Sequence, residues 1–171
     1  MKHAKSVKLA EEGGTPRQST SIEIWTDGAC KGNPGPGGWG ALLRYRDHEK
    51  ELFGGERLTT NNRMELMAVI KGLEALKKEG TAVNIYSDSQ YVVNAIEKGW
   101  LTNWLRTGFA GGKKNKDLWL EYHRCASRHS IKFFWVRGHS TNPYNNRCDE
   151  LATAAADGGN LLVDEGYEAG L

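Results

Sequence analysis

The sequence predicts a single α/β domain with a mixed sheet and helices on both faces of that sheet. Three strand-like segments come first along the chain, and helix-like and strand-like segments alternate after them, an order that is typical of this architecture. The chain has 171 residues, of which 39% are hydrophobic, and this is enough for one compact core.

The first three strands are predicted from local pattern. Residues 22–27 alternate apolar and polar side chains. A turn-rich glycine loop is expected over residues 28–40. Residues 41–45 and 51–53 are then predicted as the second and third strands, joined by a polar turn at residues 46–50.

The later elements are placed by capping signals and spacing. Asn62 is the expected cap of a helix, with Glu65 as its capping-box partner three residues later, and Gly80 is the expected end. Asn142 and Pro143 predict the start of the last helix, which runs to the end of the domain. Further strands are predicted at residues 83–86 and 131–136, and further helices near residues 91–96, 101–106 and 117–128.

The domain is expected to span residues 21–157. Residues 1–20 are polar, with glycine and proline near their end, and are predicted to be a flexible N-terminal extension. From Cys148 to the end there are six acidic residues and no Lys or Arg, so residues 158–171 are predicted to be an acidic tail.

The glycine run contains a match to a dinucleotide-binding pattern, but its context does not support that function. Residues 35–40 match the pattern G-x-G-x-x-G, which binds dinucleotides only where it opens a helix. Here a predicted strand follows, and Pro36 stiffens the turn. A glycine-rich hairpin is therefore expected, and a dinucleotide site is not.

Membrane insertion and disulfide bonding are not expected. No apolar run approaches the roughly 20 residues that span a bilayer, and the N-terminal lysines precede no apolar stretch. We therefore expect a cytoplasmic protein. The three cysteines, Cys30, Cys125 and Cys148, lack metal-type spacing and are expected to be reduced thiols outside any zinc site.

Charge is unevenly distributed along the chain. The net charge is only +2, yet residues 98–116 contain five Lys or Arg and no acid. This stretch is expected either to form a basic patch that faces a polyanion or to be a solvated helix face.

Four acidic residues are candidates for chemistry. Asp27 and Asp88 end predicted strands, Asp88 just before a helix, where α/β sheets bind ligands, and Glu65 and Asp149 lie on predicted helices. Each also has a structural interpretation, as a turn former, a helix cap, a capping-box partner or a surface acid. If they converge, their mutual repulsion calls for cations, and oxygen ligands favour Mg²⁺ or Mn²⁺ over zinc. Spacing alone does not establish convergence.

Five segments, in order, resemble the signature blocks of type 1 ribonuclease H in its bacterial, stand-alone form. They are residues 26–40 (TDGACKGNPGPGGWG), 59–66 (TTNNRMEL), 87–91 (SDSQY), 135–139 (WVRGH) and 146–152 (NRCDELA). The resemblance covers residues 22–157 and implies a five-stranded mixed sheet of order 3-2-1-4-5 flanked by helices.

The resemblance also implies an activity and a cofactor. It implies an endonuclease that hydrolyses the RNA strand of RNA–DNA hybrids and leaves 5′-phosphate and 3′-hydroxyl ends. Asp27, Glu65, Asp88 and Asp149 are then expected to bind two Mg²⁺ ions, with Mn²⁺ as a substitute and Asp27 as the bridging ligand. His139 matches the mobile catalytic histidine of the family. A monomer is expected, and no protein partner can be inferred.

Substrate contacts are implied at matching positions. Those expected on the RNA strand are Cys30, Asn33, Asn61, Asn62 and Gln90, and short amides suit the 2′-hydroxyl. Thr60 matches a contact to a DNA phosphate. Residues expected in a basic protrusion that grips the DNA strand are Trp100, Lys113, Lys114 and Lys116. Trp104 and Trp119 are expected to be mostly core, and the loop over residues 108–116 is more glycine-rich than the bacterial pattern.

Three alternatives are weighed against this prediction. A catalytically silent hybrid-binding module would favour fewer acids near phosphates. A related DNA exonuclease or resolvase would lack the blocks at residues 61–65 and 138–139. A domain derived from a reverse transcriptase would differ in context more than in chemistry.

Overall fold

The fold is taken from a computed structural model, which describes residues 21–138 and 141–171. The strands are β1 (Ile22–Cys30), β2 (Gly35–Tyr45), β3 (His48–Thr59), β4 (Ala82–Ser87) and β5 (Ser130–Trp135). The helices are α2 (Asn61–Glu74), α3 (Gln90–Glu97), α4 (Trp100–Thr107), α5 (Lys116–Ala126), α6 (Pro143–Asp157) and α7 (Glu165–Glu168). The sheet has the order β3-β2-β1-β4-β5, so the predicted topology is confirmed.

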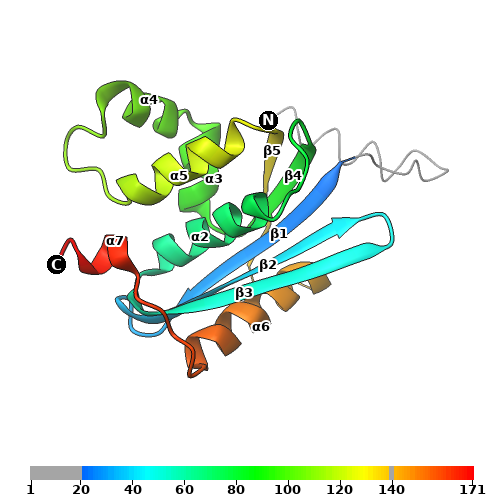
Figure 1. The fold of residues 1–171 in the computed structure, drawn as a ribbon, viewed down its shortest axis with the longest axis horizontal. Helices are drawn as coiled ribbons and strands as arrows, with labels where there is room; N and C mark the ends of the chain where they lie inside the picture. The colour runs from blue at the N-terminus through cyan, green and yellow to red at the C-terminus, as the bar shows by residue number, and fades with distance from the viewer. Residues whose placement is uncertain (1–20, 139–140) are drawn as a thin grey trace.

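The sheet is covered on both faces (Figure 1). β1 pairs antiparallel with β2 and parallel with β4, so it lies at the centre of the sheet. Helices α2 to α5 cover one face, where Ile24 and Ile85 join the main core. Helix α6 covers the other, where Trp25 and Tyr86 pack with the buried Cys148. Among the helices of the described residues, none is long and apolar enough to cross a membrane.

The glycine run is mostly strand, and the predicted long loop over residues 28–40 is wrong. Only residues 31–34 connect β1 to β2. A Cβ at Gly38 would lie 2.1 Å from the carbonyl oxygen of Ala152, and one at Gly40 would lie 2.6 Å from that of Cys148. Glycine therefore allows the backbone of α6 to lie directly on β2. The β2–β3 turn is also tighter than predicted, because β3 already begins at His48.

Both ends of α2 differ from the prediction. Thr60 is the N-cap, and its side chain accepts a hydrogen bond from the Arg63 backbone N–H, so Asn62 lies inside the helix. The helix stops at Glu74, well before Gly80. For the last helix, the predicted Asn142 cap is confirmed, because the Asn142 side chain accepts from two backbone N–H groups in the first turn.

The C-terminal residues pack on the domain. Leu162 forms a parallel bridge with Glu56 on β3, beyond the end of α6. Asp164 is buried and accepts hydrogen bonds from the Arg63 guanidinium at 2.8 Å and from the Thr59 hydroxyl at 2.6 Å. Arg63 also pairs with Asp117 on α5 at 2.7 Å. One buried guanidinium therefore ties α2 to both α5 and the C-terminal segment.

Candidate active site

Three carboxylates converge at one edge of the sheet. In the parallel β1–β4 pair, Thr26 lies opposite Ser87. The next residues are therefore side by side: Asp27 lies within β1, and Asp88 follows the last residue of β4. Glu65 reaches them from α2, and the three side chains offer ligand atoms that all lie within 4.8 Å of one another.

Gly28 makes the approach of α2 possible. A Cβ at this position would lie 2.4 Å from the backbone nitrogen of Glu65, so a larger residue would push the helix away. The Gly28 backbone N–H also donates to Asp27 Oδ1 at 2.8 Å and to Glu65 Oε1 at 3.1 Å. One backbone donor therefore holds two of the acids in place.

The structural interpretations of two acids are wrong. Since Thr60 caps α2, Glu65 is not the capping-box partner of Asn62, and it points instead to Gly28. The N-cap of α3 is Ser89, whose hydroxyl accepts from the Val92 backbone N–H, so Asp88 does not cap that helix.

The fourth acid lines the same cleft. Asp149 on α6, together with Asp27, Glu65 and Asp88, borders an open cleft of about 460 Å³. The close packing of α6 against Gly40, the β2 partner of Asp27, brings this helix near enough. All four predicted acids thus share one cleft.

Burial makes the acids costly to ionise. It raises the pKa of the Asp27 carboxyl to about 8, and the charges of Asp88 and Asp149 contribute further. Burial, followed by the charge of Asp27, also holds the pKa of the Glu65 carboxyl well above its usual range. Glu65 Oε2 is buried, and no N–H or hydroxyl group of the described residues donates to it, although the Asp27 and Glu65 carboxyl groups are themselves in hydrogen-bonding contact. A cation in the cleft would satisfy this oxygen and reverse the repulsion.

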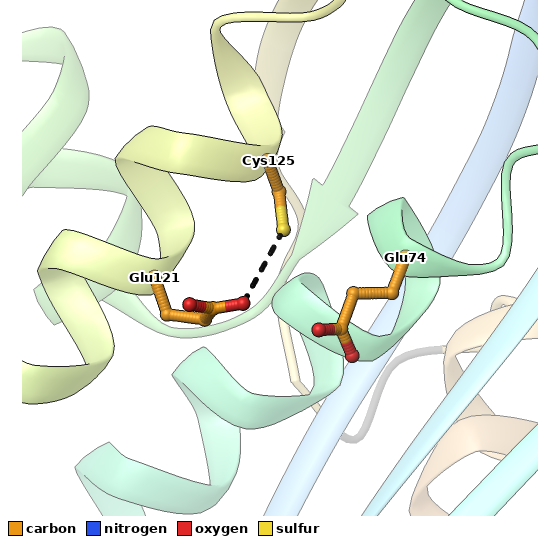
Figure 2. A group of neighbouring side chains, drawn as sticks. All are labelled: Glu74, Glu121 and Cys125. Atoms are coloured by element: carbon orange, nitrogen blue, oxygen red, sulfur yellow. Dashed lines mark hydrogen bonds between the residues drawn. The ribbon is translucent and has the colours of Figure 1, made fainter.

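Within the described parts of the chain, a second group also has ligand atoms close enough to hold a metal ion. It comprises Glu74, Glu121 and Cys125 (Figure 2). The Arg124 guanidinium pairs with Glu121 and lies 3.9 Å from Glu74, so a protein cation already neutralises these acids. Burial and Glu74 raise the pKa of the Cys125 thiol, which keeps it protonated. All three cysteines are free thiols, as predicted.

The family model for RNase H matches residues 19–157 of this sequence. The chain belongs to the RNase H family. A "Ribonuclease H" of Syntrophus aciditrophicus (strain SB) is 50% identical over 173 residues, covering 98% of this chain and 99% of the relative. One of Oleidesulfovibrio alaskensis is 56% identical over 147 residues, covering 84% and 95%. This RNase H is therefore an enzyme of the ribonuclease H class.

Solved structures agree with this assignment. LC9-RNase H1, described as a type 1 RNase H with the type 2 active-site motif, matches at a TM-score of 0.75 and 31% identity, covering 91% of this chain and 82% of that chain. LC11-RNase H1, solved in complex with RNA/DNA hybrid, matches at a TM-score of 0.60 and 25% identity, covering 80% and 97%.

In this RNase H, most residues expected to contact the hybrid line two adjoining clefts. Cys30 lies on the wall of the acidic cleft with Asn61 and Asn62. The same two asparagines continue into a second cleft of about 650 Å³, where the predicted residues Asn33, Thr60 and Lys114 lie. The Asn33 side chain accepts from the Asn61 backbone N–H at 3.0 Å, so the β1–β2 turn and the start of α2 are joined.

The remaining predicted contacts lie outside both clefts. Their residues are Gln90 at the start of α3, Trp100 at the start of α4, Lys113 before α5 and Lys116 at its start. Trp100 is 39% exposed, whereas Trp119 is fully buried, as expected. Trp104 packs against the main core, also as expected. His139 lies outside the described residues.

Sequence reasoning passed over two residues that shape this RNase H. Gly28 positions Asp27 and Glu65, and Arg63 anchors α2 two residues before Glu65. Both lie inside the recognised blocks, so the resemblance carried the signal. No local feature of the sequence distinguishes Gly28 from other glycines beside an acid, or Arg63 from other arginines in an amphipathic helix.

Proposed function

We propose that this ribonuclease H hydrolyses the RNA strand of RNA–DNA hybrids with two divalent metal ions. The observation that supports this most is the acidic cleft, where the buried Glu65 Oε2 lies beside Asp27 and Asp88 and receives no N–H or hydroxyl hydrogen bond from the described residues. Purely oxygen donors fit Mg²⁺, with Mn²⁺ as a substitute. Asp27, Glu65, Asp88 and Asp149 would hold the ions, and Asp27 is proposed as the ligand shared by both because it lies on the central strand of the sheet, β1.

When bound, the two ions would lower the pKa of an attacking water and stabilise the charge on the leaving oxygen, which gives 5′-phosphate and 3′-hydroxyl ends. The protein itself holds the acidic side chains in the positions that the ions would require. Gly28 orients Asp27 and Glu65 through its N–H group, and the β1–β4 register sets the position of Asp88 beside them.

We assign the preference for an RNA strand over a DNA strand to the asparagine side chains that lie beside the four acids. Asn33, Asn61 and Asn62 line the clefts with side chains that can both donate to and accept from a 2′-hydroxyl, and Cys30 lies on the wall of the acidic cleft. Gln90, at the start of α3 outside both clefts, is proposed to contact the RNA strand as well. On the DNA side, Thr60 and the exposed Lys113, Lys114 and Lys116 would contact phosphates, and Trp100 would lie against the strand.

His139 is proposed as an auxiliary proton carrier that acts beside the metal site. An unperturbed imidazole titrates near neutral pH, which suits this role. The monomeric state, the cytoplasmic location and the absence of membrane association stay predictions.

The decisive test uses a 5′-labelled RNA paired with DNA, incubated with the protein in Mg²⁺ and separately in EDTA. Shortened RNA in Mg²⁺ alone, with the DNA strand intact and products that a poly(A) polymerase extends from a 3′-hydroxyl, is the expected result. A hybrid that is retarded on a gel but never cut would identify a binding module. Comparable cleavage of duplex DNA would identify a DNA nuclease.

A further inference from the structure

Asp88 differs from Asp27 in how its backbone is held. Asp27 lies within β1 and pairs with Gly40 across the antiparallel ladder. Asp88 follows the last residue of β4 and precedes the cap of α3, so it belongs to neither element. A carboxylate at such a junction needs support from another part of the chain if its position is to be well defined.

Trp135 supplies one such support. It is the last residue of β5 and lies opposite Ser87 in the parallel β4–β5 pair. Its indole N–H donates to the backbone carbonyl of Asp88 at 3.2 Å. The side chain is 46% exposed, so burial in the core does not account for its position. The Val136 N–H adds a bond to the Ser87 carbonyl at 2.9 Å and extends the pairing up to Asp88.

Gly138 supplies a second support, at the carboxylate itself. A Cβ at this position would lie 2.8 Å from Asp88 Oδ2. Gly138 does not have a positive φ, so its backbone conformation does not call for glycine. What calls for glycine is the space taken by the Asp88 carboxyl group, which the chain borders closely after β5.

We propose that Trp135 and Gly138 are positioning residues for Asp88: the indole holds its backbone and the bare Gly138 backbone limits where its carboxylate can lie. The inference rests on the proposed function, in which Asp88 is a metal ligand. Support of a ligand by residues behind it typically changes metal affinity 10–100-fold when it is lost.

The test compares metal binding in two variants. Trp135→Phe keeps an aromatic ring and removes the N–H, and Gly138→Ala places a methyl group against Asp88 Oδ2. Isothermal titration of each protein with Mn²⁺, without nucleic acid, is expected to give a dissociation constant raised about 10-fold, the low end for such support. The Mg²⁺ concentration for half-maximal hybrid cleavage should rise in parallel, while cleavage at saturating Mg²⁺ stays near the wild-type rate.

Phe53→Leu is the matched control, because Phe53 is an aromatic residue on β3 that is 63% exposed and lines neither the acidic cleft nor the second cleft. Its metal affinity should equal that of the wild type. Melting temperatures in EDTA check that each variant is folded.

The outcomes separate this inference from the proposed function. If the wild type cleaves hybrids but both variants bind Mn²⁺ as it does, the positioning role is wrong and the function stands. If Trp135→Phe raises KM for the hybrid without changing its metal dependence, Trp135 is a nucleic-acid contact and the positioning role is again wrong. If the wild type binds Mn²⁺ without cleaving hybrids, the function fails while the titrations still decide the role of Trp135 and Gly138.

Discussion

Among the residues that the structure describes, two groups of side chains have metal-ligand geometry, and their surroundings are opposite. Asp27, Glu65 and Asp88 lie at the end of the central strands with two of the three buried. Glu74 on α2 and Glu121 on α5 lie near each other (Figure 2) and are partly exposed. The Arg124 guanidinium pairs with Glu121 and lies 3.9 Å from Glu74. In the first group burial raises the pKa of the acids; in the second the Arg124 hydrogen bond lowers the pKa of Glu121.

The contrast between these surroundings shows that proximity of acids is by itself a weak criterion for a metal site. An ion pair already supplies the positive charge to the second group, and a metal ion would have to displace Arg124. In the first group burial makes the charged form of Asp27 and Glu65 unfavourable, so a cation bound between them would remove the cost of ionising them.

Neutralising one acid in the first group should have a very large effect on cleavage, and neutralising one acid in the second group should have almost none. Asp27→Asn is expected to abolish hydrolysis of a labelled hybrid, because it removes the ligand assigned to both ions. Glu121→Gln, the matched change on α5, should leave the rate within a factor of two. Retention of more than a tenth of the wild-type rate by purified Asp27→Asn protein would contradict the two-metal assignment.

Metal-induced stabilisation gives a second, activity-independent contrast. Mg²⁺ at 100 times its dissociation constant should stabilise the wild type by about 2.7 kcal/mol, because it binds the folded state only. Differential scanning calorimetry should show this stabilisation as an increase in Tm on adding Mg²⁺. The increase should be the same for the wild type and Glu74→Gln, and much smaller for Asp27→Asn. If Glu74→Gln lost as much of the Mg²⁺-dependent increase in Tm as Asp27→Asn, the second group would also be a metal site.

Much of the fold could be predicted from local pattern, because strand alternation and helical spacing depend on neighbouring residues. The Asn142 cap shows this well, since Pro143 follows it directly. The errors arose where tertiary packing decides. Residues 35–40 form a strand because α6 lies against Gly38 and Gly40, a contact with residues more than 100 positions away.

The site was predictable as a set of acids only through the resemblance. Spacing suggested that Asp27 and Asp88 follow strands, but it could not show that Glu65 turns toward Gly28. The pairing of Arg63 with Asp164 across 101 positions has no local signature either. Such long-range polar contacts depend on the completed fold, so pattern alone leaves them undetermined.

The last contrast between the two groups is in stability as a function of pH in EDTA. The folded-state pKa of Asp27, about 8, exceeds its ordinary value of 3.8, so between these values the folded protein binds more protons than the unfolded chain. Stability therefore falls as pH rises through this range. Asn resembles the protonated acid, so Asp27→Asn should match the wild type at pH 4 and melt higher at pH 8.5, by about 2–4 °C for each kcal/mol gained.

Glu121 should show the opposite sign. The Arg124 hydrogen bond lowers the pKa of its carboxyl below the ordinary 4.5, so its contribution is present above that value and is lost as pH falls through the folded-state pKa. Glu121→Gln should therefore melt slightly lower than the wild type at pH 8.5, and the difference should shrink as pH drops below about 4. Melting curves of the three proteins across this range test both signs together. If Asp27→Asn also melted lower at pH 8.5, the protein itself would stabilise the buried carboxylates, and burial in the cleft would not favour a bound cation.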